Sequence, residues 1–198
     1  MADRNDADTA TRIAAGDDKT NYDNVAITLH WLTALLVVVQ FALAETWDWF
    51  SHDTTEAMQS VHVSFGILLA AVILSRLIWR WIPGHQRPAI VSGRVELASK
   101  GVHYLLYLLL VVQAVLGFII GWGAGHAMHF FGIAIPDPLG TLARATRHDA
   151  REIHEKVGWA IVLLAFGHAL AALYHHYRLH DRVLGRMLPL ARRSERPA

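Results

Sequence analysis

The sequence predicts an all-α fold, an integral membrane four-helix bundle, and three observations support this prediction. First, the 198-residue chain is 54% hydrophobic and contains four long apolar stretches. Second, each stretch has roughly the 20 residues that a helix needs to cross a ~30 Å hydrocarbon core. Third, runs such as ALLVVVQFALA and YLLYLLLVVQAVLGFII lack the polar stripe of a helix that faces water. Because backbone groups in lipid must bond within their own segment, we expect helices at residues 26–44, 61–82, 102–122 and 153–177.

The first helix follows a polar, acidic segment. Residues 1–24 carry six aspartates and little apolar content, which is typical of a disordered tail. The ALA at residues 42–44 resembles a signal-peptide cleavage site, but a signal peptide begins with basic residues and this chain begins with acidic ones. We therefore predict a transmembrane domain over residues 25–180, between this acidic tail and a basic tail at residues 181–198.

The connections between the remaining helices differ in basic residues. The first connection has no Lys or Arg, whereas the second carries four and the C-terminal tail is rich in arginine. The positive-inside rule then places both termini and the second connection in the cytoplasm. Residues 123–150 form the third connection, expected outside as a long loop with a short surface helix, and it brings basic residues near the last helix. The basic residues of the second and third connections are Arg80, Arg87, Arg94, Lys100, Arg144, Arg147 and Arg151.

Composition excludes several kinds of chemistry. The chain has no cysteine, so disulfides, thiolate metal sites, iron–sulfur clusters and thiol catalysis are ruled out. The net charge of +1 gives no global basic field, so no nucleic-acid partner is expected. The unusual feature is the number of histidines, which is thirteen.

Four of these histidines lie in the predicted helices. His30 is one turn into the first, His62 and His154 open the second and fourth, and His168 follows fourteen residues after His154. Fourteen residues are about 40° short of four full turns, so His154 and His168 point to nearly one face, about 21 Å apart along the axis. Given the directions of the helices, His30 and His168 share the cytoplasmic level and His62 and His154 share the outer level. The sequence thus predicts two histidine pairs in the bundle core.

Paired histidines at each level favour haem. Two axial imidazoles complete the coordination of haem iron and leave no open position, which suits electron transfer. Gly66 and Gly158 lie one turn beyond His62 and His154. They either let a flat macrocycle approach the helix backbone or let the helices pack closely, since small residues are common at membrane helix interfaces.

The histidines allow three other interpretations. Interhelical hydrogen bonds explain single membrane histidines well, but they explain matched depths and a shared face less well. A proton relay is disfavoured because no Asp or Glu lies in the middle of any predicted helix. A zinc or copper site is disfavoured because two histidines at a level are too few and no Cys or carboxylate completes the set.

Several segments together resemble the bacterial cytochrome b561 family. They are LHWLTALLVVVQFALA, VHVSFGILL, RLIWR and IHEKVGWAIVLLAFGHALAALYHHY, followed by DRVLGRMLP. The resemblance covers about residues 22–190 and is strongest in the first, second and fourth helices. It implies two b-type haems per chain, with His30 and His168 as axial ligands of the cytoplasmic-side haem and His62 and His154 as those of the periplasmic-side haem.

The resemblance also implies a function in the bacterial inner membrane. Similar proteins pass electrons between a periplasmic donor, unidentified here, and the membrane quinone pool. The same broad superfamily includes b-type cytochrome anchor subunits of larger oxidoreductases such as hydrogenases, although this length and pattern fit a stand-alone member better. A non-redox, histidine-based transporter is the alternative from a different class. The sequence does not decide between a monomer and a homodimer.

Three further residues compete for roles at the cytoplasmic level. His103 opens the third helix at the depth of His30, and is either an alternative ligand or a contact for a haem propionate or quinone. Arg76 and Arg80 end the second helix. They either reach lipid phosphates, as long basic side chains commonly do, or pair with haem propionates.

Overall fold

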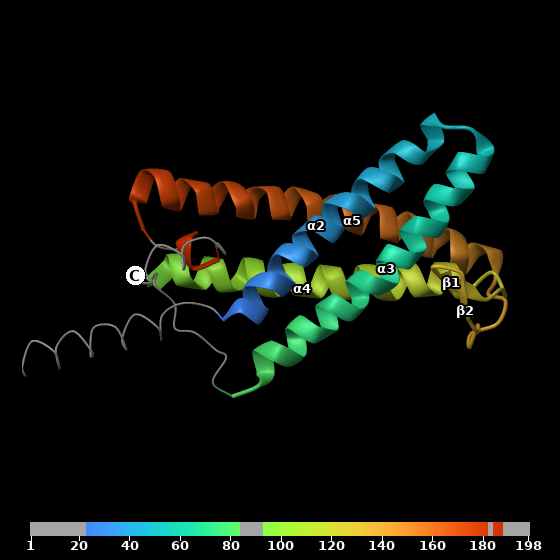
Figure 1. Cartoon of the computed structure of the whole chain (residues 1–198), viewed down its shortest axis with the longest axis horizontal. Coiled ribbons are helices and arrows are strands. Elements are labelled where there is room, and N and C mark those ends of the chain that lie inside the picture. The colour runs from blue at the N-terminus through green and yellow to red at the C-terminus, as the bar shows by residue number, and fades with distance from the viewer. Residues whose placement is uncertain (1–22, 84–92, 182–183, 188–198) are drawn as a thin grey trace, which may run out of the picture.

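Four long helices dominate the computed structural model, which describes residues 23–83, 93–181 and 184–187 (Figure 1). Most of the two expected tails lies outside the described residues. The long helices are α2 (Asn24–Thr46), α3 (His52–Trp81), α4 (Gly93–Trp122) and α5 (Arg144–Tyr174). Short elements complete the described chain: 3-10 turns at Trp47–Trp49 and Gly185–Met187, a π-helical turn at His175–Leu179, and strands β1 (Met128–Phe130) and β2 (Ile133–Ile135).

All four helices are long and apolar enough to cross a membrane. Only a small core is buried between them, and large apolar side chains on every helix face outward. In water this exposure would be costly, whereas in lipid the outward face needs no protein partner. The buried core draws on all four helices through Leu36, Leu69, Val72, Ile73, Leu110 and Ile161.

The helices form two antiparallel pairs, α2 with α3 and α4 with α5. Figure 1 shows the first pair crossing the second at an angle, with α2 and α4 both starting from the same end of the bundle. That end also holds the C-terminal part of α5, and the opposite end holds the connection after α2 and the β1–β2 hairpin. This arrangement gives the four helix directions that the predicted topology requires.

Three helices begin earlier than predicted. α3 starts at His52 instead of near residue 61, α4 at Gly93 instead of near residue 102, and α5 at Arg144 instead of near residue 153. The prediction counted the apolar span only, but a helix continues into water for as long as its polar residues allow. His62 and His154 therefore do not open their helices; each lies about three turns inside. The short surface helix expected in the third connection is the start of α5 itself.

The third connection contains a β-hairpin that the sequence analysis did not predict. Met128 pairs with Ile135 and Phe130 with Ile133, which leaves Phe131 and Gly132 as a two-residue turn. Both turn residues have positive φ, +46° and +88°, as a type I′ turn requires. Ser64 of α3, buried to 2% exposure, holds the strained phenylalanine, since its Oγ accepts a 3.0 Å hydrogen bond from the Phe131 N–H. The hairpin is thereby fixed to α3 close to His62.

Side-chain bonds tie the other end of the bundle together. Asp23 caps α2 by accepting from the Ala26 N–H at 2.8 Å, and both of its oxygens lie 3.1 Å from the Trp79 indole nitrogen at the end of α3. The Trp31 indole donates to the Met187 carbonyl at 2.7 Å. The start of α2 is thus bonded both to α3 and to the segment after α5.

Candidate functional site

The outer histidine pair joins the two helix hairpins. His62 of α3 and His154 of α5 face each other with ring centroids 6.4 Å apart and ring planes at 69°. Trp47 covers the pair from the end of α2, with its ring 5.4 Å from that of His62. Both histidines are half-buried. The structure therefore brings together the two residues that the sequence placed at this level.

The inner histidine pair has the same geometry. His30 of α2 and His168 of α5 lie with ring centroids 6.4 Å apart and ring planes at 76°. Since His154 and His168 are on one helix, the two levels are about 21 Å apart along α5. A third ring, His103 of α4, lies closer to His168 at 5.0 Å, and its Nδ1 is bonded to the Ser99 carbonyl at 2.6 Å.

The 6.4 Å separation fits a metal between two imidazoles. Two metal–nitrogen bonds of about 2 Å each fill some 4 Å of it, and the distance from each nitrogen to its ring centre fills the rest. A direct hydrogen bond between the rings would bring them closer. Among the described residues, the Nδ1 atoms of His62 and His154 are buried without a hydrogen-bond partner. Buried polar atoms normally have a partner, so these two nitrogens are compatible with a further group at the outer pair.

Comparisons with known proteins identify the family of this chain. The sequence model of the prokaryotic cytochrome b561 family matches residues 21–190. The chain is 32% identical to cytochrome b561 homolog 2 of Escherichia coli over 175 residues, which are 84% of this chain and 90% of that protein. The chain belongs to the prokaryotic cytochrome b561 family.

Two further relatives extend the comparison. Identity is 29% over 179 residues with a probable superoxide oxidase of Yersinia pestis, covering 86% of this chain and 97% of the relative. It is 29% over 173 residues with cytochrome b562 of Cereibacter sphaeroides, covering 84% and 94%. Members of the family are b-type haem proteins, usually with two haems per chain. The protein is accordingly a multi-pass bacterial membrane cytochrome of the b type that works in electron transfer.

Two glutamines, which the sequence analysis passed over, surround the outer pair of this cytochrome. Gln40 of α2 donates from Nε2 to the His62 carbonyl at 2.9 Å. A Cβ at Gly66 would lie 2.9 Å from that same amide nitrogen, and a Cβ at Gly158 would lie 3.3 Å from the Nε2 of Gln113. The two glycines therefore admit glutamine side chains from the neighbouring helices. These contacts are of the kind that the close-packing interpretation of the glycines requires.

This packing gives a prediction with a matched control. Gly66→Ala should displace the Gln40 amide and weaken its bond to His62, an interaction worth about 1 kcal/mol. At Gly167 of α5 a Cβ would meet nothing within 4 Å. We expect Gly66→Ala to have a lower melting temperature than Gly167→Ala when both purified haem-loaded variants are heated. Equal melting temperatures would show that Gln40 relaxes at no cost.

The two hairpins carry matching residues, a relation that is not visible as a fixed repeat in the sequence. In α2 and α4 a histidine precedes a glutamine by ten residues, as His30–Gln40 and His103–Gln113. In α3 and α5 a histidine precedes a glycine by four residues, as His62–Gly66 and His154–Gly158. Fourteen residues after His62 the first hairpin has Arg76, where the second has His168. The inner level thus combines three histidines and one arginine, one from each helix.

Arg76 is in contact with the inner pair. Its Nη2 lies 3.2 Å from His30 Nδ1, and its guanidinium lies 5.3 Å from the centre of the Tyr107 ring on α4. Arg80, one turn further along α3, is exposed and lies 5.8 Å from the Tyr104 ring. The structure therefore separates the roles of two arginines that the sequence left equivalent.

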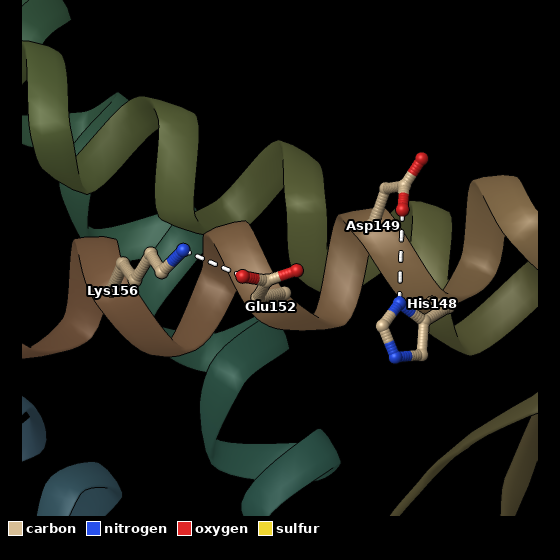
Figure 2. A network of polar contacts seen from close by, with 4 residues as sticks. All are labelled: His148, Asp149, Glu152 and Lys156. Carbon is tan, nitrogen blue, oxygen red and sulfur yellow. Dashed lines mark hydrogen bonds and ion pairs between the residues drawn. The ribbon is translucent and has the colours of Figure 1, made fainter.

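Charged side chains surround His154 on the exposed face of α5. Figure 2 shows two contacts there, Lys156 with Glu152 at 2.6 Å and His148 with Asp149 at 3.7 Å. Both are surface pairs, which contribute little to stability. They show that the first three turns of α5 are polar, so the outer histidine pair lies near the edge of the apolar span.

Three other histidines of the described residues lie at neither level. His129 is exposed on β1, and His126 is exposed in the loop before it. At the other end of the bundle, His175 contacts the Asp181 carboxylate at 2.5 Å, which ties the π-helical turn to the chain that follows.

Proposed function

We propose that this cytochrome passes electrons between a donor on the outer side of a bacterial inner membrane and the membrane quinone pool. One haem is held by His62 and His154, and a second by His30 and His168. The observation that carries the proposal is the equal 6.4 Å separation of the two histidine pairs. When bound, each haem iron supplies one-electron redox chemistry, and imidazoles on both faces leave no position open for a further ligand.

The protein's own residues hold and separate the two sites. Helix α5 contributes a histidine to each level, so its rigidity sets the spacing. Between the levels lies the apolar core that includes Leu69, Leu110 and Ile161. These side chains keep water and polar groups out of the region between the two sites. Such burial is one of the means by which a protein sets the reduction potential of a bound haem.

The proposed sidedness follows from charge. The chain before the first helix is acidic, but the second connection and the C-terminal tail concentrate Lys and Arg, which supports a cytoplasmic position for both termini. With this orientation the His62–His154 pair faces the outside and the His30–His168 pair faces the cytoplasm.

The arginines at the start of α5 favour a small anion as the candidate donor. Arg144, Arg147 and Arg151 all belong to the outer part of α5, against the general trend of the positive-inside rule. Arg151 precedes His154 by three residues on α5, so the two are neighbours on the helix surface. The Yersinia pestis relative is named a probable superoxide oxidase. Superoxide is an anion and a one-electron donor, so it is the first donor to test.

A membrane-anchor subunit and a histidine-based transporter are the competing functions. Relatives named as cytochromes match over 90% and 94% of their own length, which supports a stand-alone protein. A reduced-minus-oxidised absorbance spectrum distinguishes the proposed cytochrome from a transporter, because a transporter without haem has no b-type bands. Reduction of quinone by the purified protein alone distinguishes it from an anchor subunit, because an anchor needs its catalytic partner.

Haem stoichiometry tests the proposed ligand set directly. Two histidine pairs imply two haems per chain, so haem and protein measured on the same purified sample should give a molar ratio near two. Haem is measured as its pyridine complex and protein by amino-acid analysis. A ratio near one in fully loaded protein would mean that one of the pairs does not bind haem.

A further inference from the structure

We propose that Arg76 is the anion-binding residue of the inner site, that it pairs with the propionate carboxylates of the inner haem, and that its charge raises the reduction potential of that haem. The inference rests on the proposed function, because it assumes a haem between His30 and His168. It adds a positioning residue that is not an iron ligand and a reason for the direction of electron transfer.

The position of Arg76 is the first argument. Its side chain reaches from α3 to both neighbouring helices, since Nη2 lies 3.2 Å from His30 Nδ1 of α2 and the guanidinium lies over Tyr107 of α4. Arg76 is half-buried, whereas Arg80 is exposed one turn nearer the end of the helix. A guanidinium that only reached for lipid phosphate would turn outward, as Arg80 does.

The second argument is the lack of an acidic partner. The ion pairs among the described residues do not include Arg76. At this end of the bundle the Asp23 carboxylate bonds to the Trp79 indole and to the backbone of α2. Arginine stays charged in proteins, and an unpaired charge within a membrane-spanning segment is costly. An anion from outside the chain would remove this cost.

The third argument comes from the protonation of His30. A neutral imidazole that binds iron through one nitrogen carries its proton on the other. Once Nε2 of His30 is an iron ligand, Nδ1 is a donor and cannot accept a hydrogen bond from Arg76. Iron ligation through Nε2 would therefore remove the hydrogen bond from Arg76 to His30 and would leave the guanidinium available to another acceptor. A b-type haem brings two carboxylates, and guanidinium groups bind carboxylates with matching geometry.

The matching of the two hairpins is the fourth argument. Arg76 takes the place in α3 that His168 takes in α5, fourteen residues after the outer histidine. A residue at this place therefore lies at the inner site by the same geometry that places His168 there. The first hairpin thus has an arginine where the second has a histidine, and this arginine gives the inner site a fixed positive charge. The outer level has no such charge at the equivalent place.

This charge has a consequence for direction. Reduction adds a negative charge to the haem, so a nearby guanidinium favours the reduced form and raises the potential. At an effective dielectric constant of about 20, a unit charge some 10 Å away changes an equilibrium by about tenfold. Compared with a neutral residue at this place, Arg76 therefore favours electron transfer from the outer haem to the inner haem.

The test uses Arg76→Gln, Arg76→Lys and the control Arg80→Gln, which removes an equal charge one turn away. Each purified haem-loaded variant is titrated electrochemically, and the two haems are followed by their absorbance. Arg76→Gln should lower the reduction potential of the inner haem by about 59 mV, which is a tenfold change in equilibrium for a one-electron couple. Arg76→Lys should recover most of this change. Arg80→Gln should change the equilibrium of the inner haem less than twofold. The potential of the outer haem should be unaffected in all three variants.

Infrared spectroscopy gives a second readout that does not depend on activity. With haem labelled with carbon-13 at the propionate carboxyls, the labelled bands in the redox-difference spectrum should shift in Arg76→Gln and not in Arg80→Gln. Unchanged inner potential and unchanged bands in Arg76→Gln would overturn the inference and leave the proposed function intact. Loss of the inner haem in Arg76→Gln but not in Arg76→Lys would support the need for a cation. Loss in both would overturn the inference in favour of a structural role. A wild-type protein with a single haem would instead refute the proposed function.

Discussion

Replacement of either His62 or His154 by alanine is expected to remove the same haem, the outer one, and to lower the haem-to-protein ratio from about two to about one. In the proposed outer site an iron would lose half of its protein ligands with either imidazole, and the two rings face each other at 6.4 Å. Residues that bind one cofactor act as a unit, so their effects are not additive. The double variant should therefore also keep a ratio near one. Absorbance spectra of the three variants, with the remaining haem compared band by band, check this.

His52→Ala is the matched control for these variants. His52 is on the same helix as His62, but it is exposed, and its one ion pair within the described part of the chain is with Glu56 at 3.2 Å. Its replacement should keep both haems. If His62→Ala and His154→Ala left spectrally different haems behind, the two residues would belong to different sites and the proposed outer pair would be wrong.

The helices and the histidine levels were predictable because lipid imposes strong constraints. A span of about 20 apolar residues has few structural choices, and helical geometry then fixes the depth of every residue along it. The pairing of His30 with His168 and of His62 with His154 follows from depth alone, and the ring separations of 6.4 Å agree with it. The ends of the helices were less predictable, because the polar first turns of α3 and α5 lie beyond the apolar span.

Features that depend on tertiary contact were not predictable from the sequence. The hairpin turn places Phe131 at positive φ, which no local preference of phenylalanine favours. A bond from its N–H to Ser64, on a helix more than sixty residues earlier, stabilises it. Gln40 is a single polar residue in an apolar run, and its role follows from the position of Gly66 and the His62 carbonyl on the neighbouring helix.

The same limit applies to the inner site. Sequence analysis left Arg76 and Arg80 with identical alternatives, because both end the same helix one turn apart. Their environments differ since Arg76 is oriented toward His30 and Tyr107, whereas Arg80 faces outward beside Tyr104. The spacing of fourteen residues from His62 to Arg76 was visible in the sequence. It indicates a position at the inner site only because the two hairpins match in space.

His30→Ala is expected to remove the inner haem, to spare the outer one, and to abolish electron transfer from an outside donor to quinone. The outer pair keeps both of its ligands, so a donor added outside should still reduce the protein, but only to about half of the wild-type extent. The measurement uses proteoliposomes of known orientation with a membrane-impermeant reductant, and it follows haem absorbance and quinone reduction together. If the remaining haem were reduced faster from the cytoplasmic side, the assigned faces would have to be exchanged.

His103 is the residue that makes this experiment informative. Its ring is 5.0 Å from that of His168, which is shorter than the 6.4 Å of the other two pairs. A metal cannot lie between these rings in the same geometry until they separate, and His103 is also held by its bond to the Ser99 carbonyl. We therefore expect His30→Ala and the His30→Ala, His103→Ala double variant to have the same haem content, near one per chain. If the single variant kept two low-spin haems and the double variant fell to one, His103 would be a replacement ligand. In that case the inner site would bind haem with whichever histidine, from α2 or from α4, faces His168.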